Sequence, residues 1–247
     1  MPVTQALVLA ALLAAACVPV HADGQASPLA WINSVRRAAG AQPAGPDAVL
    51  SATAQAWAGV LAASGLLSHR GADGSSVLDR YRSQGGTEAH VGEIIGAGRN
   101  LAAIEEGWMA SPDHRKLAAS ASWTHAGWGS APSGASTVWV ILFCEKLVQG
   151  LRLEASGDGM VVSGSFVPRG AVRALLYAGL DLLEPAEWDL ASRQFSFAVP
   201  RNQETGYFRL GYLSAGGAFR LTNAFTLLPG TESPGEPARF EAPARSP

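Results

Sequence analysis

The stretch Trp108-Met109-Ala110-Ser111-Pro112-Asp113-His114-Arg115 marks a boundary between two helices. Trp108 follows Leu101 and Ile104 at helical spacing, which predicts a helix from about Asn100 to Ala110. Ser111-Pro112 then supplies a capping hydroxyl and a proline for a first turn, so a second, short helix is predicted to begin there. That helix carries His114, one of the five histidines in the chain.

Helical spacing also recurs upstream of this stretch, and strand-like runs follow it. The upstream helices are predicted at about Pro28–Ala39, Leu50–Gly65 and Val77–Gly85. Apolar runs at His125–Ser130 and Thr137–Phe143 predict two strands. Helices first and strands late, within about 120 residues, favour helices packed on a sheet. Residues 28–148 are therefore predicted to form one α+β domain.

The chain changes character after Gly150. Short β-like runs, mostly separated by Gly, Pro, Asp or Asn, replace the helical spacing. They are residues 151–153, 160–166, 172–177, 195–199, 207–213 and 219–228. This pattern predicts a small all-β, sandwich-like domain over residues 150–228. Residues 229–247 are rich in Pro, Glu and Ser and are predicted to be a disordered tail.

Residues 1–22 contain no charged side chain and include an apolar run from Ala6 to Val18. The run is followed by Val20-His21-Ala22, a small-x-small cleavage pattern, so residues 1–22 are predicted to be a secretory signal peptide. An alternative keeps Cys17 as a lipidated N-terminus, because Ala15-Ala16-Cys17 is similar to a lipobox. We therefore expect export to the periplasm or the extracellular space, and no transmembrane helix in the mature chain.

The formal net charge is −2, and all the charged side chains lie after residue 22. This charge does not favour capture of nucleic acid or of an anionic membrane, so no nucleic-acid partner is expected. Removal of a signal peptide would leave Cys144 as the one cysteine, which excludes an internal disulfide. Cys144 belongs to a strongly apolar run and is predicted to be a small buried hydrophobe.

Three polar residues are candidates for chemistry. His69 and His114 each follow a polar turn, and Glu93 lies in the mostly apolar, glycine-flanked segment Val91–Gly96. A carboxylate in such a segment needs a buried partner, because burying its charge alone is costly. The serines beside the two histidines lie outside any Gly-x-Ser-x-Gly elbow, so no serine nucleophile is indicated.

Five motifs follow one another along residues 29–147. They are Asn33-Ser34-Val35-Arg36; Ser68-His69 with Asp73-Gly74 and Asp79-Arg80; Gly92-Glu93; the stretch from Trp108 to Arg115; and Thr124-His125-Ala126-Gly127-Trp128-Gly129. In these motifs, and in their order, the sequence resembles the bacterial extracellular branch of the CAP superfamily, also called SCP-like. It departs from the family's pattern at Ile94, where the family has Asn, and at Asp113, where the family has Gly.

The resemblance implies an α-β-α sandwich with a central cleft, which here precedes the all-β domain. The family's cleft pairs two histidines with acidic residues, and some members bind a divalent metal there. Carried over to this sequence, the cleft residues are His69, Glu93 and His114, with Ser111 where the animal and plant branches have a second glutamate. Two alternatives follow. Glu93 is the centre of a structural polar network, or His69 and His114 are ligands of an open site for a metal such as zinc.

Three functions are compatible with these residues. The first is a non-catalytic module that binds a small amphiphile, a lipid or an envelope component at the cleft. The second is a metal-assisted hydrolase of a peptide or another extracytoplasmic substrate, with Glu93 as general base for a metal-bound water. The third is a structural or adhesive role in which the all-β domain makes the contacts. The first is favoured, because the cleft residues include no evident nucleophile.

Overall fold

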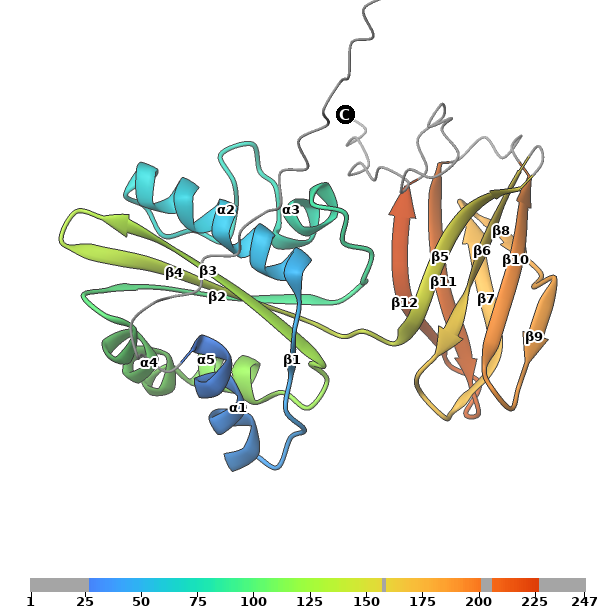
Figure 1. Cartoon of the computed structure of the whole chain (residues 1–247), viewed down its shortest axis with the longest axis horizontal. Helices are drawn as coiled ribbons and strands as arrows, with labels where there is room; N and C mark the ends of the chain where they lie inside the picture. The colour runs from blue at the N-terminus through green and yellow to red at the C-terminus, as the bar shows by residue number, and fades with distance from the viewer. Residues whose placement is uncertain (1–26, 157–158, 201–205, 227–247) are drawn as a thin grey trace, which may run out of the picture.

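A computed structural model of the protein describes residues 27–156, 159–200 and 206–226 (Figure 1). The predicted signal peptide over residues 1–22, Cys17 and the predicted tail over residues 229–247 lie outside the described residues. Within the described part of the chain, no helix is both long enough and apolar enough to cross a membrane. Two regions follow one another: helices and one sheet as far as Cys144, and strands alone from Val148 onward.

The first region is built around a four-stranded mixed sheet with the strand order β1-β3-β4-β2. Its strands are β1 (Gly45–Pro46), β2 (Val91–Gly98), β3 (His125–Ser133) and β4 (Ser136–Cys144). One face is covered by α2 (Ala48–Ser64) and α3 (Val77–Ser83), and the other by α1 (Pro28–Ala38), α4 (Leu101–Ala110) and α5 (Pro112–Ala119) (Figure 1). The α-β-α sandwich expected from the sequence is confirmed.

Strand β4 explains why the sheet needs helices on both faces. Its side chains alternate between the two hydrophobic cores, since successive residues of a strand point to opposite faces. One set of β4 side chains points toward α1, α4 and α5: Trp139, Ile141 and Phe143. The alternate set points toward α2 and α3: Val138, Val140 and Leu142. Cys144 at the end of the strand is fully buried, and burial raises the pKa of its thiol. The prediction that Cys144 is a small buried hydrophobe is confirmed.

The predicted helix boundaries agree with the structure and have local causes. The Ser27 hydroxyl accepts a hydrogen bond from Ala30 N at the start of α1, and the Asn100 side chain accepts one from Ala103 N at the start of α4. Helix α2 ends at Gly65, whose φ of 69° is the left-handed conformation that glycine adopts without strain. A hydroxyl cap, an amide cap and a terminal glycine thus set these helix ends in the structure.

Strand β2 has no counterpart among the strands predicted from the sequence. Its glycines lower the strand propensity of the segment, but they admit bulky side chains of the neighbouring layer. A Cβ added at Gly96 would lie 2.6 Å from Ile104 Cγ2, and one added at Gly92 would lie 2.8 Å from the Trp123 ring. The pattern of glycines in β2 therefore reflects close packing against distant parts of the chain.

The second region consists of two four-stranded sheets that enclose one hydrophobic core. One sheet has the order β5-β6-β10-β9, with β5 (Val148–Ser156), β6 (Gly159–Phe166), β10 (Gln194–Pro200) and β9 (Glu187–Asp189). The other has the order β12-β11-β7-β8, with β12 (Phe219–Thr226), β11 (Tyr207–Ser214), β7 (Ala171–Ala178) and β8 (Asp181–Leu183). The six predicted strands are present. The three-residue strands β8 and β9 are additional, because so short a segment carries no detectable alternation.

A short segment before β2 joins the two regions. Residues 87–89 pair with residues 222–224 of the edge strand β12 through two backbone hydrogen bonds of 2.7 and 2.9 Å. Beside them, Arg220 of β12 lies with Nη2 2.5 and 2.6 Å from the two carboxylate oxygens of Glu145. The β-rich region is therefore attached to the first region by backbone pairing as well as by an ion pair.

Candidate functional site

The site begins where α2 ends. After Gly65 the chain passes along the side of α2, where Trp57 Nε1 donates to Ser68 O at 3.2 Å. The Ser68 hydroxyl accepts from Arg70 N at 3.0 Å and so fixes a tight turn around His69. The His69 side chain itself is 59% exposed. This turn holds the imidazole over the sheet while leaving most of it open to solvent.

Helix α3 contributes the cation of the site. Its first turn is closed by a capping box, in which the Ser76 hydroxyl and the Asp79 carboxylate bond to each other's backbone N–H groups. Arg80 follows directly, and its Nη1 donates to His69 O at 3.3 Å and to Ser75 O at 3.2 Å. The guanidinium carbon lies 3.8 Å from the centroid of the Trp57 ring. These contacts fix the position of the charge against an aromatic face.

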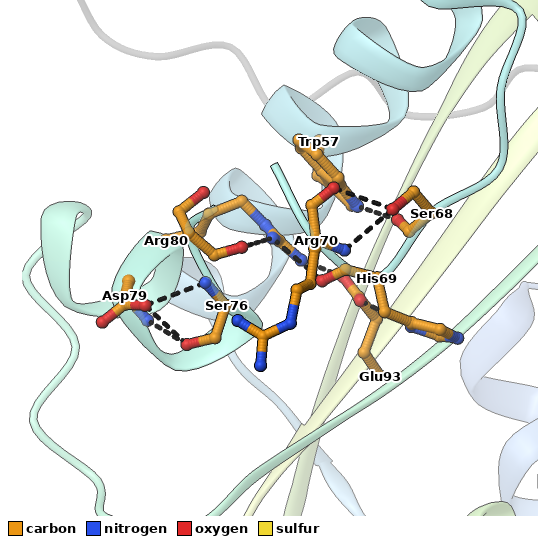
Figure 2. A network of polar contacts seen from close by, with 9 residues as sticks. Trp57, Ser68, His69, Arg70, Ser76, Asp79, Arg80 and Glu93 are labelled. Carbon is orange, nitrogen blue, oxygen red and sulfur yellow. Dashed lines mark hydrogen bonds and ion pairs between the residues drawn. The ribbon is translucent and has the colours of Figure 1, made fainter. Parts of the chain in front are cut away.

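Glu93 on β2 lies between these two elements (Figure 2). One carboxylate oxygen, Oε1, lies 2.8 Å from His69 Nδ1, and the other, Oε2, lies 2.8 Å from Arg80 Nη2. The Glu93 side chain is only 3% exposed. A carboxylate buried to this extent requires partners of opposite charge or hydrogen-bond donors, and it has one of each kind on its two oxygens.

The two histidines differ in their electrostatic surroundings. The hydrogen bond that His69 donates to the Glu93 carboxylate raises the pKa of His69 above its ordinary value of 6.5, against the opposing effect of partial burial. His114, half-buried on α5, has a lowered pKa, because of burial first and of the charge on His69 second. The imidazole of His69 is therefore the more basic one, and the two rings lie near enough for the first to affect the second.

Among the described residues, direct side-chain contact connects two of the four predicted cleft residues. His69 and Glu93 are in direct contact, whereas no hydrogen bond or ion pair between described residues connects His114 or Ser111 to Glu93. Ser111 ends α4 and precedes α5, and its side chain makes no capping hydrogen bond. Sequence reasoning gave no role to Arg80 and Trp57, although Asp79-Arg80 is one of the recognised motifs. Their part depends on contacts between separate elements.

The described residues do not fit the metal site considered from the sequence. They include no group of three or more His, Cys, Asp or Glu side chains placed to hold a metal ion. Each oxygen of Glu93 already accepts a hydrogen bond from a neighbouring side chain. Glu93 is thus engaged with His69 and Arg80, and it orients the imidazole of His69 through Nδ1.

A hollow of about 400 Å³ adjoins the Glu93 network on the side of Arg80. Its walls come from α2, α3 and the turn around Asp73, and Trp57 and Arg80 belong to both the hollow and the network. The walls are mainly apolar, and Ala56, Trp57 and Val60 of α2 contribute to them. The arrangement combines a mainly apolar surface with one fixed cation, Arg80, and one carboxylate, Asp73.

Comparisons with known proteins agree with this architecture. A profile of the CAP family, described as the cysteine-rich secretory protein family, matches residues 29–145. This region is a CAP domain.

Three solved structures illustrate what the CAP domain is similar to. An outer surface protein of Borrelia burgdorferi is 19% identical, with 46% of this chain and 86% of that one covered and a TM-score of 0.44. An extracellular SCP-domain protein of Bacillus anthracis is 19% identical, with 48% and 39% covered and a TM-score of 0.44. A cysteine-rich secretory protein of Staphylococcus aureus is 19% identical, with 47% and 36% covered and a TM-score of 0.36. The match therefore spans well under two thirds of the last two proteins. No curated protein sequence matches the chain.

The first motif of the CAP domain has a structural role. The Asn33 side chain both donates to Ala44 O and accepts from Ala44 N, at 3.1 and 2.8 Å. Arg36 is fully buried and donates to three backbone carbonyls, which belong to Gln42, Ser120 and Trp123. These bonds tie α1 to the segments before β1 and before β3, so this motif stabilises the layer opposite the Glu93 network.

Proposed function

We propose that this is an exported protein whose CAP domain binds a small amphiphile, such as a lipid or an envelope component, without catalysing a reaction. The predicted signal peptide over residues 1–22 supports export. The observation that carries the binding proposal is the hollow beside Trp57 and Arg80, where apolar walls end at a fixed guanidinium. An amphiphile has the matching combination of an apolar body and a polar end.

The energetics favour a ligand of this kind. A volume of about 400 Å³ lies in the range of small-molecule sites. Each methylene group that a ligand buries against such walls contributes about 0.8 kcal/mol. Arg80 is already positioned by Glu93 and by Trp57, so a polar end group would bind it without a further loss of side-chain entropy.

The state of Glu93 supports binding rather than metal-assisted hydrolysis. A general base must contact the water that it activates, and the Glu93 side chain is only 3% exposed. Both oxygens of Glu93 accept hydrogen bonds at 2.8 Å from neighbouring side chains, and the described residues offer no three-ligand metal cluster. The network is arranged to fix charges in place.

The proposal can be tested by thermal denaturation of the mature chain with palmitate, lysophosphatidylcholine and cholesterol as probes. A probe that binds the folded state only, present at 100 times its Kd, stabilises the protein by about 2.7 kcal/mol. The informative variant is Ala56→Phe, which fills part of the hollow. Its control is Ala52→Phe, which is also an exposed position, one turn earlier on α2 and outside the hollow.

We expect at least one probe to raise the Tm, Ala56→Phe to abolish the rise and Ala52→Phe to preserve it. If none of the three probes shifts the Tm, or if both variants respond as the unmodified protein does, the hollow is not the binding site and the proposal fails.

A further inference from the structure

We propose that the outer face of the sheet β5-β6-β10-β9 is a second binding site, whose ligand is a neutral glycan chain. This face lies in the β-rich region, on the sheet that does not contain the joining strand β12 (Figure 1). The site is separate from the CAP domain and does not depend on the function proposed for it.

The strand register places polar side chains in two continuous rows across this face. The first row runs through the paired positions Arg152, Ser163, Ser196 and Glu187, and the second through Gln149, Ser165, Gln194 and Asp189. The alternate residues of the same strands, such as Val162 and Phe197, belong to the buried core. Every position of both rows is therefore polar, on a face that the core does not use.

The first row forms a trough because its rim side chains are longer than its central ones. The two central strands, β6 and β10, carry mostly serines, whereas Arg152 on β5 and Glu187 on β9 are long side chains at the rims. The rims are three strand spacings apart, which is about 14 Å. The resulting hollow has a volume of about 810 Å³, within the range of sites that bind small organic ligands.

The polar groups of the trough are available to a ligand. Among the described residues, none makes a hydrogen bond or ion pair with the side chains of Gln149, Arg152, Ser163, Ser165, Glu187, Gln194 or Ser196, whereas Asp189 accepts from Ser192 and from Ala191 N. Serine hydroxyls and glutamine amides both donate and accept hydrogen bonds, Arg152 donates and Glu187 accepts. A ligand that matches this mixture must itself donate and accept along its length, as the hydroxyl groups of a sugar do.

The charges of the trough narrow the ligand class further. The trough contains one cation, Arg152, and two carboxylates, Glu187 and Asp189, so it does not attract a polyanion such as a nucleic acid. Trp188 and Phe195 occupy the intervening pair and belong to the core side of the sheet: Phe195 is 3% exposed, and Trp188 Nε1 donates to Val172 O of the other sheet at 3.1 Å. The outer face itself therefore presents hydroxyl and amide groups with few charges of mixed sign. The hydroxyl groups of a neutral glycan match this surface.

The test is isothermal titration of the mature full-length chain with cellotetraose, maltotetraose and chitotetraose, and with a sulfated dextran oligosaccharide for comparison. Ser196→Arg places a long side chain in the centre of the trough. Ala198→Arg is the matched control, because Ala198 lies on the same face of β10 two residues further on and outside the hollow. Glu187→Ala, a truncation of an exposed rim residue, serves as a second variant that leaves the sheet unaltered.

We expect at least one neutral tetrasaccharide to bind. Ser196→Arg and Glu187→Ala should each weaken that binding about tenfold or more, the effect of one or two lost hydrogen bonds. Ala198→Arg should leave it unchanged, as should Ala56→Phe in the CAP domain. The proposal is overturned if no neutral oligosaccharide binds, if the sulfated one binds more tightly, or if Ser196→Arg and Ala198→Arg have equal effects.

Discussion

Replacing Glu93 by glutamine tests whether charge or shape holds the network of the CAP domain together. Glutamine keeps the size of the side chain but removes the negative charge between His69 and Arg80. His69 is 59% exposed, so its contact contributes at most about 1 kcal/mol. Arg80 is only 12% exposed and would remain as a nearly buried cation without a counter-charge. We expect the free energy of unfolding to fall by about 2–4 kcal/mol, most of it through Arg80.

Urea denaturation followed by tryptophan fluorescence measures this loss. The control His69→Ala should cost about 1 kcal/mol or less, because it removes the exposed partner. The double variant Glu93→Gln with Arg80→Met removes the stranded cation together with its partner and should regain a large part of the loss. The reasoning is refuted if Glu93→Gln costs no more than His69→Ala, or if the effects of Glu93→Gln and Arg80→Met simply add.

Three further changes have expected outcomes. Because the pKa of His69 is raised above 6.5, its contact with Glu93 stabilises the fold fully below pH 6.5, and this stabilisation is lost as the pH rises through the raised pKa. An NMR titration of the imidazole should show the raised pKa, and Glu93→Gln should return it toward 6.5. Gly129→Ala would bring a Cβ within 2.2 Å of the α2 backbone and should destabilise the protein by about 1–3 kcal/mol. Gly59→Ala on α2 meets no atom within 4 Å and should stabilise the protein by about 0.5–1 kcal/mol. Equal stabilities of the two variants in urea denaturation would contradict the packing. Arg220→Met leaves the Glu145 carboxylate, which is only 10% exposed, without its guanidinium partner. It should therefore lower the free energy of unfolding by about 1–3 kcal/mol, measured by calorimetry. A loss too small to measure would show that backbone pairing alone holds the joint.

The sequence could predict the elements whose causes are local. The spacing of Leu101, Ile104 and Trp108 reflects burial of one helix face, and all three side chains are buried in α4. The uninterrupted apolar run of β4 reflects helices on both faces of the sheet. Strand β2 could not be predicted in this way, because its glycines are explained by Ile104 and Trp123, which contact it only in the folded protein.

The candidate site likewise contains one contact that the sequence could predict and one that it could not. The need of Glu93 for a buried partner follows from its apolar neighbours in sequence, and His69 is one of its partners. Arg80 could not be identified as the other, because its position depends on Trp57 from α2 and on the turn around His69. Convergence of side chains from three separate elements is a property of tertiary packing, which residue spacing does not encode.

The pairing of residues 87–89 with the edge of β12 limits how the protein can be divided for experiments. A fragment that ends near Gly150 would leave the N–H of Ala89 and the carboxylate of Glu145 without their partners, and the complementary fragment would expose a bare sheet edge, a template on which other chains aggregate. Aggregation of either fragment would then reflect the loss of this pairing rather than an inability to fold. Soluble fragments would have to be obtained by co-expression or by substitutions that protect the uncovered sheet edge.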